Sequence, residues 1–145
     1  MCLKSINLNK KLYLSDNMVE KGKLIAIGVN TKEELSKKKI ELLKSVQVIF
    51  AHARKDEKNK ALIEVTPVLE ERKDYKKLML VKPVFPKNPS EKSLNNAWDM
   101  AAAILDNYLN SGRNVGFLTS GDPLKTDFKF AYERLKDNFE IEIYE

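Results

Sequence analysis

The chain has 145 residues, of which 43% are apolar and 32% are charged, and its formal net charge is +5. This length and composition predict one globular domain, and they exclude a membrane protein because no apolar run approaches the ~20 residues of a spanning helix. The N-terminus lacks the long apolar centre of a secretory signal, so we expect a cytoplasmic protein. Because Cys2 is the only cysteine, an internal disulfide framework is excluded.

Lysine supplies most of the positive charge, and the lysines are scattered among nearly as many carboxylates. A surface that binds nucleic acid would interleave arginine with aromatic side chains on one face, so we expect no nucleic-acid partner. The pattern is instead typical of a solvated, lysine-rich surface. Its broad positive field favours an anionic ligand.

The first half of the chain alternates between strand-like and helix-like segments. Residues 23–29 ("KLIAIGV") predict a short buried strand. Thr31 and Glu34 then fit a capping box, which predicts a helix over residues 33–45. Residues 46–52 ("VQVIFAH") predict the next strand.

A charged loop is expected at residues 53–60. The segment 61–65 predicts a short helix that fails near Pro67, since proline removes a backbone donor from a helix. Residues 75–81 predict a third strand. The segment 82–89 contains prolines throughout and is predicted to hold no regular structure.

The longest helix is predicted to begin after Ser90, its N-cap, and to end at Gly112. We interpret Trp98 on this helix as a core residue. The apolar positions with helical spacing are Leu94, Ala97, Trp98, Ala101, Ala102, Leu105, Tyr108 and Leu109. A fourth strand, a further helix and a last strand follow at residues 114–119, 128–135 and 139–145.

Alternating strands and helices predict an α/β fold: an open, mainly parallel five-stranded sheet with helices on both faces. Ligands of such sheets bind beyond the carboxyl ends of the strands. Two loops are expected there, at residues 28–34 and 119–123. Gly121 lets a ligand approach the backbone, but Gly-Asp-Pro is also a common turn composition. The pattern alone leaves an ordinary turn and a binding loop both open.

Other candidate residues carry less weight. His52 is the only histidine, and a lone histidine makes neither a metal cluster nor a catalytic triad. Asp56 and Glu57 are interpreted as part of a solvated loop. The sequence contains no G-x-G-x-x-G, Walker loop or paired-cysteine zinc spacing, so we expect no metal and assign no catalytic residue.

Four stretches together resemble a known family: "GKLIAIGV", "KKIELLKSVQVIFAH", "VFPKNPSEKSLNNAWDMAAAIL" and "GRNVGFLTSGDP". Through them, residues 21–145 are similar to the N-terminal domain of the tetrapyrrole (corrin/porphyrin) methylases. Within that family, the proline-rich segment followed by the helix with Ala97 and Trp98 is most similar to the precorrin-2 C(20)-methyltransferases of cobalamin biosynthesis.

The resemblance implies a homodimeric two-domain enzyme with S-adenosyl-L-methionine as methyl donor and S-adenosylhomocysteine as product. It implies a tetrapyrrole substrate, precorrin-2 or its cobalt analogue. The cofactor-binding residues that it implies are Thr119, Ser120, Gly121, Asp122, Pro123 and Leu124. The residues that it places on the substrate side are Gly28, Asn30 and Pro86.

The sequence departs from the family pattern in two loops. Relatives carry Gly-Pro-Gly-Asp-Pro after the first strand, where residues 28–32 here read Gly-Val-Asn-Thr-Lys. The loop "GDPLKTDF" is one residue shorter, with Lys125 and Asp127 where small or hydroxyl residues are common.

Two classes of function therefore stay open. The first is the N-terminal domain of a cobalamin-pathway methyltransferase, with residues 1–20 as a flexible extension and the second domain absent. The second is a binding or interaction module that keeps the methylase fold without turnover.

Overall fold

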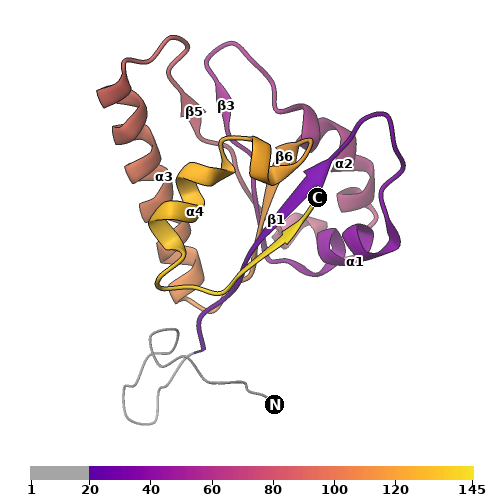
Figure 1. Cartoon of the computed structure of the whole chain (residues 1–145). Coiled ribbons are helices and arrows are strands. Elements are labelled where there is room, and N and C mark those ends of the chain that lie inside the picture. Colours follow the sequence, from indigo (N-terminus) through magenta and orange to yellow (C-terminus); the bar gives the residue numbers. More distant parts are fainter. Residues whose placement is uncertain (1–19) are drawn as a thin grey trace.

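In the computed structural model, which describes residues 20–145, five strands form one parallel sheet in the order β4-β2-β6-β1-β7 (Figure 1). Strand β6 therefore lies between β1 and β2, which precede it in the chain. The strands are β1 (Leu24–Val29), β2 (Val48–Phe50), β4 (Met79–Val81), β6 (Val115–Ser120) and β7 (Ile141–Tyr144).

Helices cover both faces of this sheet, which confirms the predicted fold class. Figure 1 shows α3 and α4 on one side of the sheet and α1 and α2 on the other. The helices are α1 (Lys37–Ser45), α2 (Lys60–Glu70), α3 (Glu91–Asn110) and α4 (Phe128–Leu135). Among residues 20–145, no helix combines the length and the apolar character that a membrane span requires.

The apolar character of β1 follows from this two-sided cover. Leu24 and Ala26 belong to the hydrophobic cluster under α3 and α4, whereas Ile25 and Ile27 belong to the cluster under α1 and α2. A strand buried on both faces reads as a continuous apolar run rather than an alternating one. The same requirement explains the fully buried residues of β6.

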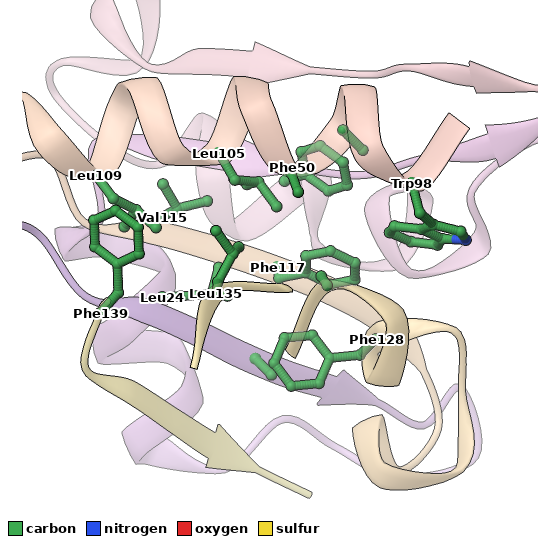
Figure 2. Packing of buried hydrophobic residues seen from close by; sticks show 14 of the residues in the cluster. Leu24, Phe50, Trp98, Leu105, Leu109, Val115, Phe117, Phe128, Leu135 and Phe139 are labelled. Carbon is green, nitrogen blue, oxygen red and sulfur yellow. The ribbon is translucent and has the colours of Figure 1, made fainter. Parts of the chain in front are cut away.

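Helix α3 forms as predicted. The Ser90 side chain accepts a hydrogen bond from the Ser93 amide at 3.1 Å, and Gly112 has a φ of 86° after the last turn. Trp98 is fully buried and packs edge-on against Phe85, with ring centroids 4.7 Å apart. Figure 2 shows Trp98, Leu105 and Leu109 pointing from α3 toward the strands.

The predicted capping box is wrong. Ser36 caps α1 and accepts a hydrogen bond from the Lys39 amide at 3.2 Å. Residues before it form a turn, in which the Asn30 side chain accepts from the Lys32 amide at 3.0 Å. Asparagine side chains favour such local turns over a helix, so neither Thr31 nor Glu34 belongs to α1.

The prediction that a helix fails near Pro67 is also wrong, because α2 continues through Pro67 to Glu70. Proline removes one backbone hydrogen bond from a helix. Val65 and Leu69 lie on either side of it and are buried in the cluster under α1 and α2. Their burial holds the helix together across the proline.

Two further boundaries differ from the predictions. Residues Tyr75–Lys77 form a 3-10 turn, η3, so the third strand of the chain's main sheet is shorter than predicted. The proline-rich segment contains a two-residue strand, β5 (Val84–Phe85), paired in parallel with β3 (Ala53–Arg54). The flanking Pro83 contributes only an acceptor, its carbonyl, to the Ala53 amide at 3.1 Å.

The predicted flexible extension over residues 1–20, which includes Cys2, lies outside the described residues except for Glu20.

We expect Trp98→Ala to lower the free energy of unfolding by about 3–5 kcal/mol, because it removes a fully buried aromatic side chain. Met100 on the same helix is 69% exposed, so Met100→Ala should change the free energy of unfolding by less than about 0.5 kcal/mol. Urea unfolding of both variants measures the difference. Equal effects would show that the burial of α3 is misassigned.

Candidate functional site

The connections that leave the carboxyl ends of the central strands lead to opposite faces of the sheet at both junctions of β6 with its neighbours. The chain after β6 leads to α4, on one face of the sheet, whereas the chains after β1 and β2 lead to α1 and α2, on the other face. Ligands of open α/β sheets bind where such neighbouring connections separate. The junctions β1–β6 and β2–β6 are therefore the two places to look for a site.

At the β1–β6 junction the backbone is open. The Gly121 amide donates to the Val29 carbonyl at 2.8 Å, and Gly121 has a φ of +90°. Within residues 20–145, and apart from Gly121 and its two chain neighbours, no heavy atom lies within 4 Å of the position that a Cβ would take there. Thr119 is buried, and its hydroxyl donates to the Gly121 carbonyl at 2.8 Å. The turn is thus held in place by its hydrogen bonds to Val29 and Thr119, and the Cα of Gly121 is open on its other side.

The rest of this turn is a short 3-10 segment, η4 (Pro123–Lys125). The Asp122 carboxylate accepts a hydrogen bond from the Leu124 amide at 2.9 Å, so it serves as a cap. Pro123 is buried, and Leu124 is 58% exposed. The turn therefore offers a backbone surface and one apolar side chain to a ligand.

Gly28, predicted on the substrate side, packs directly on this turn. A Cβ at Gly28 would lie 2.6 Å from the Gly121 carbonyl oxygen and 2.9 Å from Pro123 Cδ. The Lys39 ammonium donates to the Gly28 carbonyl and to the Glu145 carbonyl, each at 2.6 Å. Gly28 thus lies directly against Gly121 and Pro123, two of the residues predicted for the cofactor.

The other two residues predicted on the substrate side lie elsewhere. Asn30 is exposed at the end of β1 and is engaged in its local turn. Pro86 is exposed and follows β5. The structure does not bring these two residues together.

The β2–β6 junction holds a pocket of about 350 Å³. Thr119 and Ser120 line it from β6, and they are the only predicted site residues in its wall. The other polar lining residues come from the segment between β2 and the first residue of α2, which includes β3, and from the segment before α4: His52, Arg54, Glu57, Lys58, Asn59, Lys60, Thr126 and Asp127.

His52 and Asp127 face each other in this pocket, with Nε2 and Oδ2 3.8 Å apart. The contact with His52 is the main cause that lowers the pKa of Asp127, although burial opposes it. The charges of Arg54 and Lys129 act in the same direction as His52. Neither His52 nor Asp127 was predicted as a site residue. The signals in the sequence were the position of His52 after a buried strand and the departure of Asp127 from the family pattern.

The His52 ring is enclosed by aromatic side chains, with its centroid 4.9 Å from that of Trp98 and 5.0 Å from that of Phe85. Within the described residues, His52 Nδ1 and Trp98 Nε1 are buried without a hydrogen-bond partner. His52 therefore presents only Nε2 to the pocket. This differs from a catalytic dyad, in which the carboxylate binds one nitrogen and the other faces the substrate.

No group of three or more His, Cys, Asp or Glu side chains within residues 20–145 is placed to hold a metal ion.

Comparisons with known proteins match the chain to a family, to a named protein and to solved structures of similar fold. The family Tetrapyrrole (Corrin/Porphyrin) Methylases matches residues 23–144. A protein of Methanocaldococcus jannaschii named probable cobalt-precorrin-2 C(20)-methyltransferase is 28% identical over 130 residues, which are 88% of this chain and 53% of that protein. The crystal structure of a conserved hypothetical protein from Aeropyrum pernix K1 aligns with a TM-score of 0.53 at 13% identity, over 86% of this chain and 38% of that one. This chain thus spans about half the length of its named relative.

We expect Gly28→Ala to cost about 3 kcal/mol of unfolding free energy, because the new methyl group meets the Gly121 carbonyl oxygen. Gly121→Ala should cost only about 1–2 kcal/mol, since it strains a left-handed backbone but meets no non-neighbouring atom of the described residues within 4 Å. Urea unfolding of the two variants checks the order. A milder effect at Gly28 would contradict the close packing of the two loops.

Proposed function

The chain belongs to the tetrapyrrole (corrin/porphyrin) methylases, and on this premise we propose that it is the N-terminal domain of a methyltransferase of cobalamin biosynthesis. The methyl donor we propose is S-adenosyl-L-methionine, and the substrate is precorrin-2 or its cobalt analogue. The name of the Methanocaldococcus jannaschii relative supports this choice of substrate.

The observation that carries the proposal is the open turn at the β1–β6 junction. A small molecule can approach the backbone of Gly121 because, among the described residues, only its chain neighbours come within 4 Å of the Cβ position. Leu124 offers an exposed apolar side chain beside it. We assign the cofactor to the turn formed by Thr119, Ser120, Gly121, Asp122, Pro123 and Leu124, with Gly28 beneath it. The residues fit an uncharged, partly apolar group such as a nucleoside.

The bound cofactor would supply an activated methyl group, and the protein would supply position. Thr119 and Gly28 hold the turn from below through the Thr119 hydroxyl and the close contact with Gly121. A fixed turn lowers the barrier to transfer by holding the donor in line with the accepting carbon. No residue of this junction needs to form a covalent bond to the substrate.

The second candidate is a binding module of the same fold without turnover. It is favoured by the loop after β1, where the Asn30 side chain closes a local turn onto Lys32. Relatives carry a glycine-rich segment with an aspartate there, and this chain has neither. A reading frame beyond Glu145 that encodes a second methylase-like domain would favour the enzyme over the module.

We expect the chain to bind S-adenosylhomocysteine in titration calorimetry and Gly121→Ala to weaken that binding by at least about tenfold, because a methyl group fills the open space. Gly112→Ala is a matched control, since Gly112 also has a positive φ of 86° but ends α3 away from the turn. Equal binding by both variants would mean that the turn only connects two elements.

We expect no methyl transfer to precorrin-2 by the 145-residue chain alone, because the open turn cannot by itself align donor and acceptor.

We also propose that the chain associates as a homodimer, as the resemblance implies. Large apolar side chains stay exposed on several elements, among them Ile63, Val84 and Met100. Exposed apolar surface promotes association. Light scattering at high protein concentration should give twice the mass of the chain, and a monomer mass would contradict the proposal.

A further inference from the structure

We propose that the pocket between the carboxyl ends of β2 and β6 is a carboxylate subsite, in which Arg54, Lys58 and Lys60 hold one acidic side chain of a tetrapyrrole. The inference rests on the proposed function and assigns the substrate side of the site to residues that the sequence did not indicate. It replaces Asn30 and Pro86, which lie outside this pocket.

The charge of the pocket is the first argument. Within the described residues, Arg54, Lys58 and Lys60 line the pocket and make no ion pair. Of the two carboxylates in its wall, Asp127 is already engaged with His52. Glu57 and Asp127 together oppose the three cations with one carboxylate fewer, and the charge of Arg54 also acts on Asp127. An anion would complete this arrangement, whereas a cation would meet repulsion.

The loop that carries the cations is held in place rather than free. The Asn59 amide group donates to the His52 carbonyl at 2.8 Å, and the Lys55 amide donates to the Phe85 carbonyl at 2.8 Å. The Glu57 amide closes a turn onto the Arg54 carbonyl at 2.9 Å. These bonds fix the loop to β2 and to β5. Pre-organised charges lose less freedom when a ligand binds.

The start of α2 adds to the positive field. Helix α2 begins at Lys60, and its cap, Asn59, accepts from the Leu62 amide at 2.8 Å. Both residues line the pocket. The N-terminal end of a helix carries a partial positive charge that favours anions. The helix end and the three side chains therefore act in the same direction.

Two of the three hydroxyl side chains of the wall, those of Thr119 and Thr126 but not that of Ser120, have hydrogen-bond partners among the described residues. Thr119 donates to the Gly121 carbonyl at 2.8 Å, and Thr126 donates to the Pro123 carbonyl at 2.9 Å. The donors that a ligand can reach are thus the Ser120 hydroxyl and the three cationic side chains, of which Arg54 also donates to the Lys87 carbonyl at 3.4 Å. A carboxylate suits these donors, because charge-assisted hydrogen bonds are the strong ones.

The volume argues for part of a ligand rather than a whole macrocycle. Small-molecule sites span roughly 300–1,000 Å³, and this pocket, of about 350 Å³, is at the lower end. Strand β6 separates it from the open turn at Gly121, yet Thr119 and Ser120 belong to both places. A substrate side chain held here would place its ring system near the proposed cofactor turn.

The test measures binding of uroporphyrin, a tetrapyrrole with eight carboxylates, to the whole chain by fluorescence titration at low ionic strength. The pocket variant combines Arg54→Gln, Lys58→Gln and Lys60→Gln. The matched control combines Lys73→Gln, Lys76→Gln and Lys77→Gln, which remove the same charge near the amino end of β4, at the opposite end of the sheet. Lys58→Gln alone provides a milder pocket variant. Urea unfolding confirms that each variant is folded.

We expect uroporphyrin to bind the unchanged chain, the pocket variant to bind at least about tenfold more weakly, and the control to change by less than about twofold. Equal weakening by both triple variants would show a diffuse charge effect and overturn the subsite. So would an absence of uroporphyrin binding, or weaker S-adenosylhomocysteine binding in the pocket variant, which would assign the cations to the cofactor's carboxylate.

Failure of this inference is distinct from failure of the proposed function. If Gly121→Ala weakens S-adenosylhomocysteine binding but the pocket variant binds uroporphyrin as well as the unchanged chain does, the proposed function is supported and the carboxylate subsite is contradicted. If the unchanged chain binds neither compound, both fall.

Discussion

The close approach of Gly28 to the Gly121–Pro123 turn is the constraint on which the site depends. Strands β1 and β6 pair in parallel register from Leu24 and Val115 to Val29 and Ser120, so their ends arrive together. A side chain at position 28 would separate them, because its Cβ would meet the Gly121 carbonyl oxygen at 2.6 Å. Glycine there lets the turn fold back over the end of β1. The Gly121 amide can then donate to Val29.

Strand β6 has a different environment on each of its two sides. On its β1 side the turn is fixed by backbone contacts and is open above Gly121. On its β2 side a pocket is walled by charged loops. Thr119 connects them, since it lines the pocket and donates to the Gly121 carbonyl. A cofactor at one side and a charged substrate at the other would both be positioned by one buried strand.

The aromatic cluster below the pocket gives that strand a rigid support. Phe117 of β6 stacks on Phe50 of β2 at 4.8 Å, and His52 packs edge-on against Trp98 of α3 (Figure 2 shows the first two with Trp98). The buried, unpartnered nitrogens of His52 and Trp98 lie in this cluster. Buried polar atoms without partners cost stability, so these two nitrogens are unfavourable in an otherwise apolar core. It lies directly under the candidate substrate pocket.

The sequence by itself determined the elements that depend on local chemistry. The apolar run of β1, the Ser90 cap, the stripe of α3 with Trp98 and the glycine after it were all predicted, because periodicity and capping act within a few residues. The order of strands and helices then determined a parallel α/β sheet and drew attention to the loop at Gly121.

Only the tertiary structure decided features that depend on contacts between distant residues. Helix α2 continues through Pro67 because Val65 and Leu69 are buried against other elements. This burial cannot be predicted from the local sequence around Pro67. The pairing of β3 with β5 likewise unites segments far apart in the chain. The meeting of His52 with Asp127, and of Gly28 with Gly121, follows from the order of strands in the sheet. The spacing of residues in the sequence does not encode the order of the strands, because that order depends on the packing of all helices and strands of the domain together.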